Sequence, residues 1–218
     1  MTPNGTLQVA VFGATGKIGR HVIDQLLAAG HTVTAYVRDP SKLPTTHPNL
    51  TVIQGALDDP AGIGRAVKAA DAVISAIGPS LRRGATGTPV TDGTRAIVAA
   101  MQAAGARRFI GLATPSVADP RDRPTLKGKV LPALAKLALP NALTELNGMT
   151  DAVTSSELDW TIARITSPND QPATGTIRSG FLGRDKVGSA MTRADIASFL
   201  TGQLTDDTYH RAAPAISN

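Results

Sequence analysis

Three regularly spaced glycines give this sequence its strongest chemical signal. They belong to the run Gly13-Ala14-Thr15-Gly16-Lys17-Ile18-Gly19, which directly follows an apolar stretch. Between a strand and a helix, such glycines let the backbone turn tightly and approach a pyrophosphate, and the helix start offers free N–H groups to it. The hydroxyl of Thr15 can donate to the same phosphates. The loop therefore predicts a dinucleotide site, and the alternative is a glycine-rich turn without a ligand.

The residue after the second apolar stretch predicts which dinucleotide binds. Arg38 follows the β-branched segment 32–37 and lies 19 residues beyond Gly19. NAD sites usually carry Asp or Glu here, which accepts hydrogen bonds from the ribose hydroxyls. A guanidinium cannot accept those bonds, but its planar fork suits a 2′-phosphate. We therefore expect NADP(H) rather than NAD(H), with Lys42 adding charge. The alternatives are Asp39 as the ribose-binding acid and Arg38 as an ordinary surface residue.

The elements that must position these residues alternate between strands and helices. Predicted strands cover 7–12, 32–37, 50–53, 71–76, 108–113 and 160–164, and predicted helices cover 18–29, 60–70 and 88–104. Gly30 and Gly105 end the first and third helices as C-terminal caps. Strands separated by such helices form a parallel sheet with right-handed crossovers. The predicted fold class is α/β, a doubly wound Rossmann-type parallel sheet with helices on both faces and a small C-terminal annex.

The second half of the chain has weaker patterns. Helices over 130–139 and 147–156, interrupted at Pro140, and two short strands within 175–186 are predicted. A last helix over 193–204 has Thr192 as its N-cap and Asp195 in its first turn. No internal repeat or flexible linker interrupts the chain. We therefore expect a single NAD(P)-binding domain over 1–218, in which 165–218 contribute a small substrate-side annex.

Few side chains offer a catalytic acid. Neither tyrosine, Tyr36 or Tyr209, is followed by lysine at the fourth position. The absence of cysteine excludes disulfides and thiolate chemistry. There is no Gly-x-Ser-x-Gly elbow and no closely spaced histidine pair, so neither a hydrolase nor a metal site is expected. Thr114 and Ser116, after the strand at 108–113, are the catalytic candidates, and local capping of their loop is the alternative.

Four segments match a known family. They are 9–16 (VAVFGATG), 37–43 (VRDPSKL), 158–164 (LDWTIAR) and 193–197 (RADIA). Together they resemble the NAD(P)H-binding atypical short-chain dehydrogenase/reductases, and most of all the branch with NmrA-like proteins and biliverdin-IXβ/flavin reductases. The glycine loop is shared by the whole superfamily, whereas the last two segments are more specific. The match extends over most of the chain.

The resemblance implies a cofactor contact for each region. The implied residues are Gly13, Thr15, Gly16, Lys17, Ile18 and Gly19 for the pyrophosphate, Arg38 for the 2′-phosphate, Ala56 and Leu57 for the adenine, Ala76, Ile77 and Gly78 for the ribose, and Thr114, Ile165 and Thr166 beside the nicotinamide. The chain departs from the family pattern twice. Ala56 stands where aspartate is frequent, and Ile165 stands where proline usually follows the arginine.

Two functions fit these observations. The first is an NADPH-dependent oxidoreductase that transfers hydride to a flavin, quinone or similar conjugated acceptor, which can take its proton from water. The second is a non-catalytic, redox-sensing NADP(H)-binding regulator of the NmrA-like kind that acts through a protein partner. The missing Tyr-x-x-x-Lys pair is compatible with both functions, and an NADPH-oxidation assay separates them.

Charge and composition limit the partners. The net charge of +5 favours anionic ligands, but the basic residues are dispersed and aromatic residues make up only 3%, so no nucleic-acid partner is expected. Arg121, Arg123, Lys127 and Lys129 could attract an anionic substrate, although a solvated loop is the favoured interpretation. No signal peptide and no apolar stretch near the roughly 20 residues of a membrane span occur. A cytoplasmic monomer or homodimer without membrane contact is expected.

Overall fold

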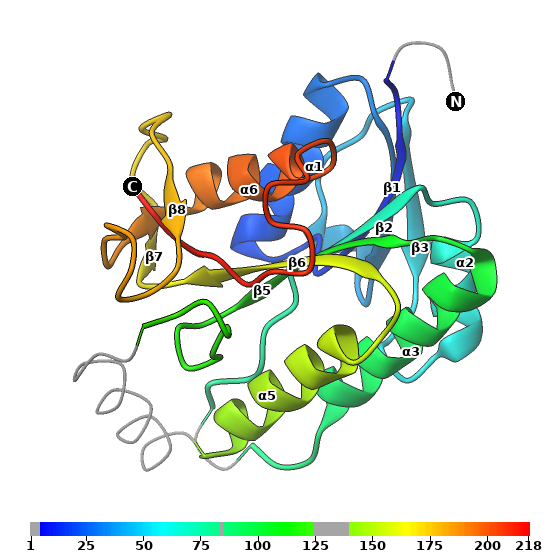
Figure 1. The fold of residues 1–218 in the computed structure, drawn as a ribbon. Coiled ribbons are helices and arrows are strands. Elements are labelled where there is room, and N and C mark those ends of the chain that lie inside the picture. Colours follow the sequence, from blue (N-terminus) through cyan, green and yellow to red (C-terminus); the bar gives the residue numbers. More distant parts are fainter. Residues whose placement is uncertain (1–4, 83–84, 124–139) are drawn as a thin grey trace.

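The computed structural model describes residues 5–82, 85–123 and 140–218, and their main feature is an eight-stranded sheet (Figure 1). The strand order is β3-β2-β1-β4-β5-β6-β10-β8. The strands are β1 (Gln8–Phe12), β2 (Thr32–Val37), β3 (Leu50–Gln54), β4 (Ala72–Ser75), β5 (Arg108–Ala113), β6 (Asp159–Ile165), β8 (Arg178–Gly180) and β10 (Ala215–Ser217). All pairings are parallel except that of β8 with β10. The expected parallel sheet thus has one antiparallel edge strand.

Helices cover both faces of this sheet. α1 (Lys17–Ala28) and α6 (Arg193–Gly202) pack on one face, and α2 (Pro60–Val67), α3 (Pro89–Ala104) and α5 (Pro140–Thr154) pack on the other (Figure 1). Neighbouring side chains of β1 pack on opposite faces of the sheet, Val11 on the α1 side and Phe12 on the α3 side. A strand covered on both faces must be apolar throughout, which explains the uninterrupted run in the sequence. The predicted α/β class is confirmed.

The C-terminal part contains a second, smaller sheet. β7 (Pro168–Asn169) pairs in parallel with β9 (Met191–Thr192), and α6 begins directly after β9. Thr192 caps α6 as predicted, since its side chain accepts a hydrogen bond from the Asp195 amide. The helix packs against α1, so the last helix of the described chain lies beside the first (Figure 1).

Several local predictions need correction. The helix predicted over 147–156 begins earlier, because Pro140 starts α5 and fits a first turn that needs no proline N–H. Only β8 forms within 175–186, since the chain turns after Gly180 and the Phe181 amide donates to Asp185 at 2.7 Å. The helix predicted over 130–139 lies outside the described residues. β2 and β5 have their predicted bounds.

The parallel arrangement places the carboxyl ends of β1, β2, β4, β5 and β6 at one edge of the sheet. Strand order reverses between β1 and β4, where open α/β sheets bind their ligands. The predicted cofactor residues follow these strands or, for Ala56 and Leu57, follow β3, whose parallel pairing with β2 puts its carboxyl end at the same edge. In the described parts of the chain, no helix combines the length and apolar character that crossing a membrane requires.

Candidate dinucleotide-binding site

The glycine loop follows β1 and closes on its own backbone. Gly13 has a φ of +78°, and a Cβ there would lie 2.8 Å from the carbonyl atoms of Ala76 at the end of β4. A Cβ on Gly19 would overlap the Gly13 carbonyl and lie 2.9 Å from the Cα of Ala14. The Gly16 amide donates to the Gly13 carbonyl at 3.0 Å. The neighbouring backbone therefore leaves no room for a side chain at Gly13 or Gly19. Backbone atoms, unlike a side chain, cannot change rotamer to make room.

The start of α1 presents its amides without a side-chain cap. Gly16 is the N-cap residue, so it has no side chain that could cap the first turn, and that turn holds no acidic residue. The first N–H groups of a helix lack partners within the helix and carry part of its positive dipole. Gly16 and Lys17 are exposed, so these donors are open to a ligand. The loop and helix start therefore fit a pyrophosphate.

Lys17 reaches away from this loop towards the C-terminal part. Its ammonium lies 2.6 Å from Asp170, which also accepts from Arg193 at 2.6 Å. The hydrogen bond from Lys17 contributes most to holding the pKa of Asp170 below its usual value. Both members of the pair are largely exposed, so a phosphate can compete for Lys17.

The end of β2 carries a free guanidinium. Arg38 is exposed, and its side chain makes no hydrogen bond or ion pair with the described residues, although its carbonyl accepts from Gln54. Asp39 is occupied, because its carboxylate accepts from the Ser41 hydroxyl at 2.7 Å and caps the 3₁₀ helix η1 (Pro40–Lys42). The Ser41 hydroxyl bond contributes most to lowering the Asp39 pKa. Arg38 rather than Asp39 is therefore available to a ligand.

A further basic residue near η1 was missed by sequence reasoning. Arg20, on α1, donates from Nη2 to the Lys42 carbonyl at 3.0 Å. The Lys42 ammonium lies 3.4 Å from Asp39. Arg20 directly follows Gly19, so its place in the first turn of the loop's own helix could have indicated it. The end of β2 thus carries more positive charge than Arg38 alone supplies.

The segment after β3 is shaped by Tyr36. Its hydroxyl donates to the Ala56 carbonyl at 2.8 Å, and its ring fills the space where a Cβ on Gly55 would lie. Burial is the main cause of the raised Tyr36 pKa, so this phenol is a poor proton donor. Leu57 packs against Gly93 of α3. Ala56 itself is exposed, next to the edge where the glycine loop lies.

The ends of β4, β5 and β6 supply the remaining predicted contacts. The Ala76 amide donates to the Phe12 carbonyl at 2.9 Å, which places Ala76, Ile77 and Gly78 beside the glycine loop. Ala113 pairs with Arg164, so Thr114 and Ile165 leave neighbouring strands at the same level, followed by half-buried Thr166. The structure thus brings the predicted cofactor residues to one edge.

Thr114 and Ser116 form a single hydroxyl pair. Their oxygens lie 2.7 Å apart, and the Val117 amide donates to the Thr114 carbonyl at 3.0 Å. This is the local turn that sequence analysis gave as the alternative to catalysis. Thr114 is nevertheless exposed, so its oxygen can also contact a ligand.

Comparison with known proteins settles the family. The profile of the NAD(P)H-binding family matches residues 13–207. The chain belongs to this family. Binding of NAD(P)H follows from that membership, and the resemblance to atypical short-chain dehydrogenase/reductases is confirmed.

Two curated relatives match part of the chain. A 3-diazoavenalumate denitrifying reductase from a Streptomyces species is 34% identical over 129 residues, which are 55% of this chain and 42% of that protein. A 3-beta-hydroxysteroid dehydrogenase from Mycolicibacterium neoaurum is 34% identical over 120 residues, which are 50% of this chain and 32% of that protein. The chain therefore spans less than half the length of these relatives.

Solved structures match over nearly the whole chain. A short-chain dehydrogenase/reductase from Veillonella parvula DSM 2008 in complex with NADP has a TM-score of 0.79 at 21% identity, covering 97% of this chain and 94% of the other. ChuY, an anaerobillin reductase from Escherichia coli O157:H7, has a TM-score of 0.78 at 21% identity, covering 96% of both chains. At this identity the likeness shows the shared fold.

The loop after β5 is fixed by an ion pair that sequence reasoning missed. Arg164 is fully buried, and its guanidinium donates to the two oxygens of Asp122 at 2.5 and 2.7 Å. Asp122 also accepts from the Leu182 amide at 2.8 Å. Burial raises the pKa of Asp122, but the bonds from Arg164 and the amides outweigh it and lower the pKa overall. In this family member the loop is thereby tied to β6 and to the C-terminal part.

The basic cluster expected after β5 is only partly described. Arg121 lies with its guanidinium carbon 5.1 Å from the centre of the Phe181 ring, and it pairs with Asp119 at 3.3 Å. It therefore packs on the protein. Arg123 is exposed, while Lys127 and Lys129 lie outside the described residues.

Asp195 accounts for the place of the segment 193–197 (RADIA), which resembles the family, in the structure. This buried carboxylate accepts hydrogen bonds from Thr174, Gly175, Thr192 and Asn218. It therefore joins the start of α6, the loop before β8 and the residue after β10. Its role in the structure is to hold the C-terminal part together beside the nucleotide edge.

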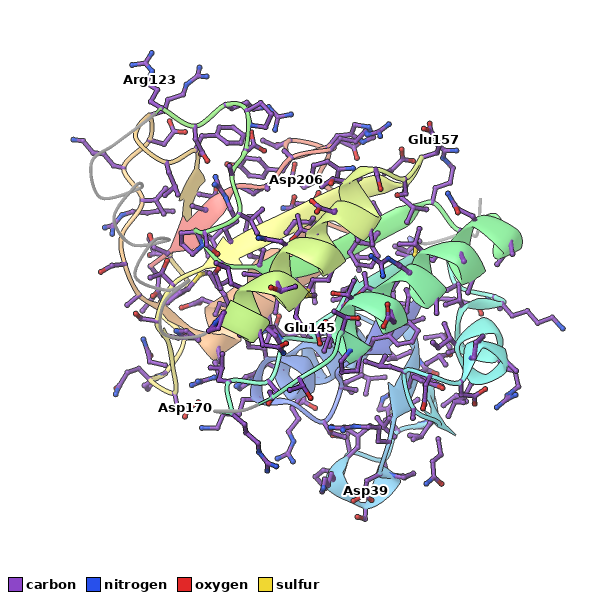
Figure 2. All side chains as sticks on the ribbon, turned by 90° about the horizontal axis from the view of Figure 1, so that it is seen from below. Asp39, Arg123, Glu145, Glu157, Asp170 and Asp206 are labelled. Carbon is purple, nitrogen blue, oxygen red and sulfur yellow. The ribbon has the colours of Figure 1, made fainter. Side chains whose placement is uncertain are left out.

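Another buried carboxylate, Glu145, is committed to structure. Its two oxygens accept from the amides of Val90 and Thr91 at 3.0 and 2.7 Å, which caps α3 from α5. Figure 2 shows Glu145 at these helices and both Asp39 and Asp170 at the periphery. Among the described residues, no three histidine or carboxylate side chains gather as metal ligands.

Proposed function

We propose that this protein is an NADPH-dependent reductase that transfers hydride to a flavin, quinone or similar conjugated acceptor. The observation that carries the cofactor choice is at the end of β2. Arg38 offers to a 2′-phosphate a guanidinium that has no partner in the described parts of the chain, whereas the neighbouring Asp39 caps η1. A ribose carrying two free hydroxyls would have to compete with Ser41 and Lys42 for the Asp39 carboxylate.

The chain's own residues hold and orient the reactants. When bound, NADPH supplies the hydride. The glycine loop and the first amides of α1 would bind its pyrophosphate, and Arg38 would bind its 2′-phosphate. The residues after β4, β5 and β6 would line the nicotinamide end, with the Thr114–Ser116 pair as hydrogen-bonding partner of the nicotinamide or the acceptor. Positioning of this kind can supply a large share of the rate without an acid.

Both tyrosine hydroxyls already have hydrogen-bond partners, which supports an acceptor that needs little acid catalysis. Tyr36 donates to Ala56, and the Tyr209 hydroxyl lies 2.9 Å from Ser179, so neither phenol serves the edge where hydride would be transferred. Flavins and quinones accept hydride into a conjugated system and can take a proton from water. The names of relatives as reductases, including ChuY, agree with this reaction class.

We further propose that residues 1–218 work as one NAD(P)-binding domain, in which 165–218 form the acceptor side. Asp195 and the Arg164–Asp122 pair support this division of roles, because they attach the C-terminal part and the loop after β5 to the edge of the sheet. The acceptor would then lie between the loop after β5 and the segment after β6.

The test is NADPH oxidation by the purified protein with flavin mononucleotide, menadione and biliverdin as acceptors. We expect turnover with at least one of them and a lower turnover number in Thr114→Val. Thr51→Val, at an exposed hydroxyl on β3, is the matched control and should keep full activity. Tight binding of both NADP⁺ and NADPH without turnover on any acceptor would favour the redox-sensing regulator instead.

A further inference from the structure

A cavity of about 460 Å³ lies between the loop after β5, α5 and the segment before β10. Pockets for small organic ligands typically measure roughly 300–1,000 Å³, so its size suits one such molecule. Ser116 and Arg121 mark the loop wall, Asp151 the α5 wall and Arg211 the third wall. None of the cofactor residues of the glycine loop lines it.

The cavity floor lies away from the nucleotide edge. Trp160 lines the cavity and pairs with Phe109 near the start of β5, whereas Thr114 follows the end of that strand. At about 3.3 Å per residue, the five residues from Phe109 to Thr114 correspond to about 16 Å along the sheet. A small molecule over Trp160 is therefore remote from the predicted nicotinamide contact. Ser116 nevertheless reaches both places, through its bond to Thr114 and its position in the cavity wall.

The walls combine an apolar floor with two opposite charges. Val117, Trp160 and Ala213 form the apolar part. Asp151 is exposed and has no cationic partner among the described residues. Arg211 donates to the Ser156 carbonyl at 2.9 Å and has no carboxylate partner in the same parts of the chain. Asp119 and Arg121 already neutralise each other. The cavity therefore leaves one positive and one negative group for a ligand.

Two residues that line the cavity have unusual features, a strained backbone in one and a polar atom without a partner among the described residues in the other. Arg211 has a φ of +47°, in the left-handed region that non-glycine residues rarely adopt. Such strain is concentrated at functional sites and ligand clamps. The buried indole N–H of Trp160 finds no acceptor in the described residues. Neither feature is explained by the nucleotide edge.

We propose that this cavity is a second binding site, for a small aromatic zwitterion. Its flat body would lie against Trp160, its anionic group would pair with Arg211, and its ammonium group would pair with Asp151. A simple aromatic anion would lie near an unpaired carboxylate, and a simple amine near an unpaired guanidinium, so a molecule carrying both charges fits best. The occupant would influence the nucleotide edge through the loop between Thr114 and Arg123.

The chain provides its own reporter, because Trp160 is its single tryptophan. We expect 4-(aminomethyl)benzoate to change the Trp160 fluorescence saturably in the protein without nucleotide. Benzoate and benzylamine, which each lack one of the two charges, should bind at least fivefold more weakly. This readout needs neither NADPH nor turnover, so it can fail or succeed independently of the proposed reductase activity.

Substitutions at the two charges complete the test. Asp151→Asn and Arg211→Gln should each weaken the zwitterion at least fivefold, while Glu157→Gln, at an exposed carboxylate outside the cavity, should leave its binding unchanged. Asp151 is exposed, so its variant keeps the test valid even if Arg211→Gln fails to fold. The absence of a saturable signal at millimolar concentration, or equal binding of all three probes, would overturn the proposal.

Discussion

The two halves of the nucleotide edge are built in different ways. Around β1 and β4, the backbone segments pack closely because Gly13 and Gly19 have no side chain, and any Cβ there would meet backbone. Around β5, β6 and the C-terminal part, it depends on buried side chains that reach across the sequence, such as Asp122 to Arg164 and Asp195 to Thr174. The region around β1 and β4 has hydrogen-bond donors that are open to a ligand. In the region around β5, β6 and the C-terminal part, the donors already have partners.

This difference separates binding from support. An edge whose helix-start amides and Arg38 have no side-chain partner within the described residues can exchange water for phosphate without breaking internal bonds. An edge in which each aspartate serves several donors contributes rigidity, and its bonds are lost only on unfolding. Substitutions in the first region should therefore change affinity, and substitutions in the second should change stability.

The largest expected effect is at the buried ion pair. Asp122→Ala leaves the fully buried Arg164 without its counter-charge and should cost about 3–5 kcal/mol of unfolding free energy in urea denaturation. Arg95→Ala, which removes an exposed pair with Asp92, is the control and should cost less than about 1 kcal/mol. Equal losses in the two variants would remove the distinction between the regions.

The same pair should give a pH dependence. Because the folded pKa of Asp122 lies below its unfolded value of about 3.9, its contribution is complete at higher pH and is lost as pH falls through the folded value. The stability difference between the wild type and Asp122→Ala should therefore shrink in acid. A difference that stays constant from neutral pH down to acid unfolding would contradict this assignment.

The next effect is at the glycine loop. Gly19→Ala places a methyl group against the Gly13 carbonyl and should weaken NADPH binding roughly a hundredfold, or about 2.7 kcal/mol, in calorimetric titration. Gly64→Ala adds the same atom to α2, where no described atom beyond the neighbouring residues and the helix's own backbone lies within 4 Å, and should leave affinity unchanged. Unchanged binding in Gly19→Ala would show that the loop does not hold the pyrophosphate.

A smaller effect is expected at the 2′-phosphate. Arg38→Ala should weaken NADPH about tenfold or more, because hydrogen bonds between charged groups contribute about 1.5–3 kcal/mol, and it should leave NADH affinity unchanged. Arg65→Ala, an exposed arginine on α2, serves as the charge-matched control. If wild-type protein binds NADH more tightly than NADPH, the cofactor assignment is wrong.

The smallest effect should come from the link between the two regions. Asp170→Asn removes a carboxylate that pairs with Lys17 beside the glycine loop, so NADPH affinity should rise about two- to threefold. The change in thermal stability should be small, because the pair is largely exposed. The exposed Asp207→Asn is the control. Weaker NADPH binding in Asp170→Asn would mean that this contact supports the loop instead of competing for Lys17.

The same contrast explains what the sequence could predict. Glycine spacing and apolar runs are local, so the loop, β2, β5 and the α/β class followed from them. Asp122 and Asp195 act through partners about 20 to 60 residues away, and no local pattern identifies such pairs. β10 is only three residues long and owes its place to pairing with β6 and β8. The place of Arg20 directly after Gly19 could have indicated a basic residue at the loop, but its contact with the Lys42 carbonyl could not be predicted, because a backbone acceptor carries no sequence signal.

The two outer strands of the sheet also differ, and the difference bears on how the molecule could associate with itself. β8 is short and antiparallel, whereas β3 has five residues and a neighbour on one side only in the described chain. Val52 in its middle is 39% exposed. An open strand edge offers unpaired amides and carbonyls to any extended peptide. Unwanted aggregation at high concentration should therefore begin at β3, and a lysine at position 52 should suppress it.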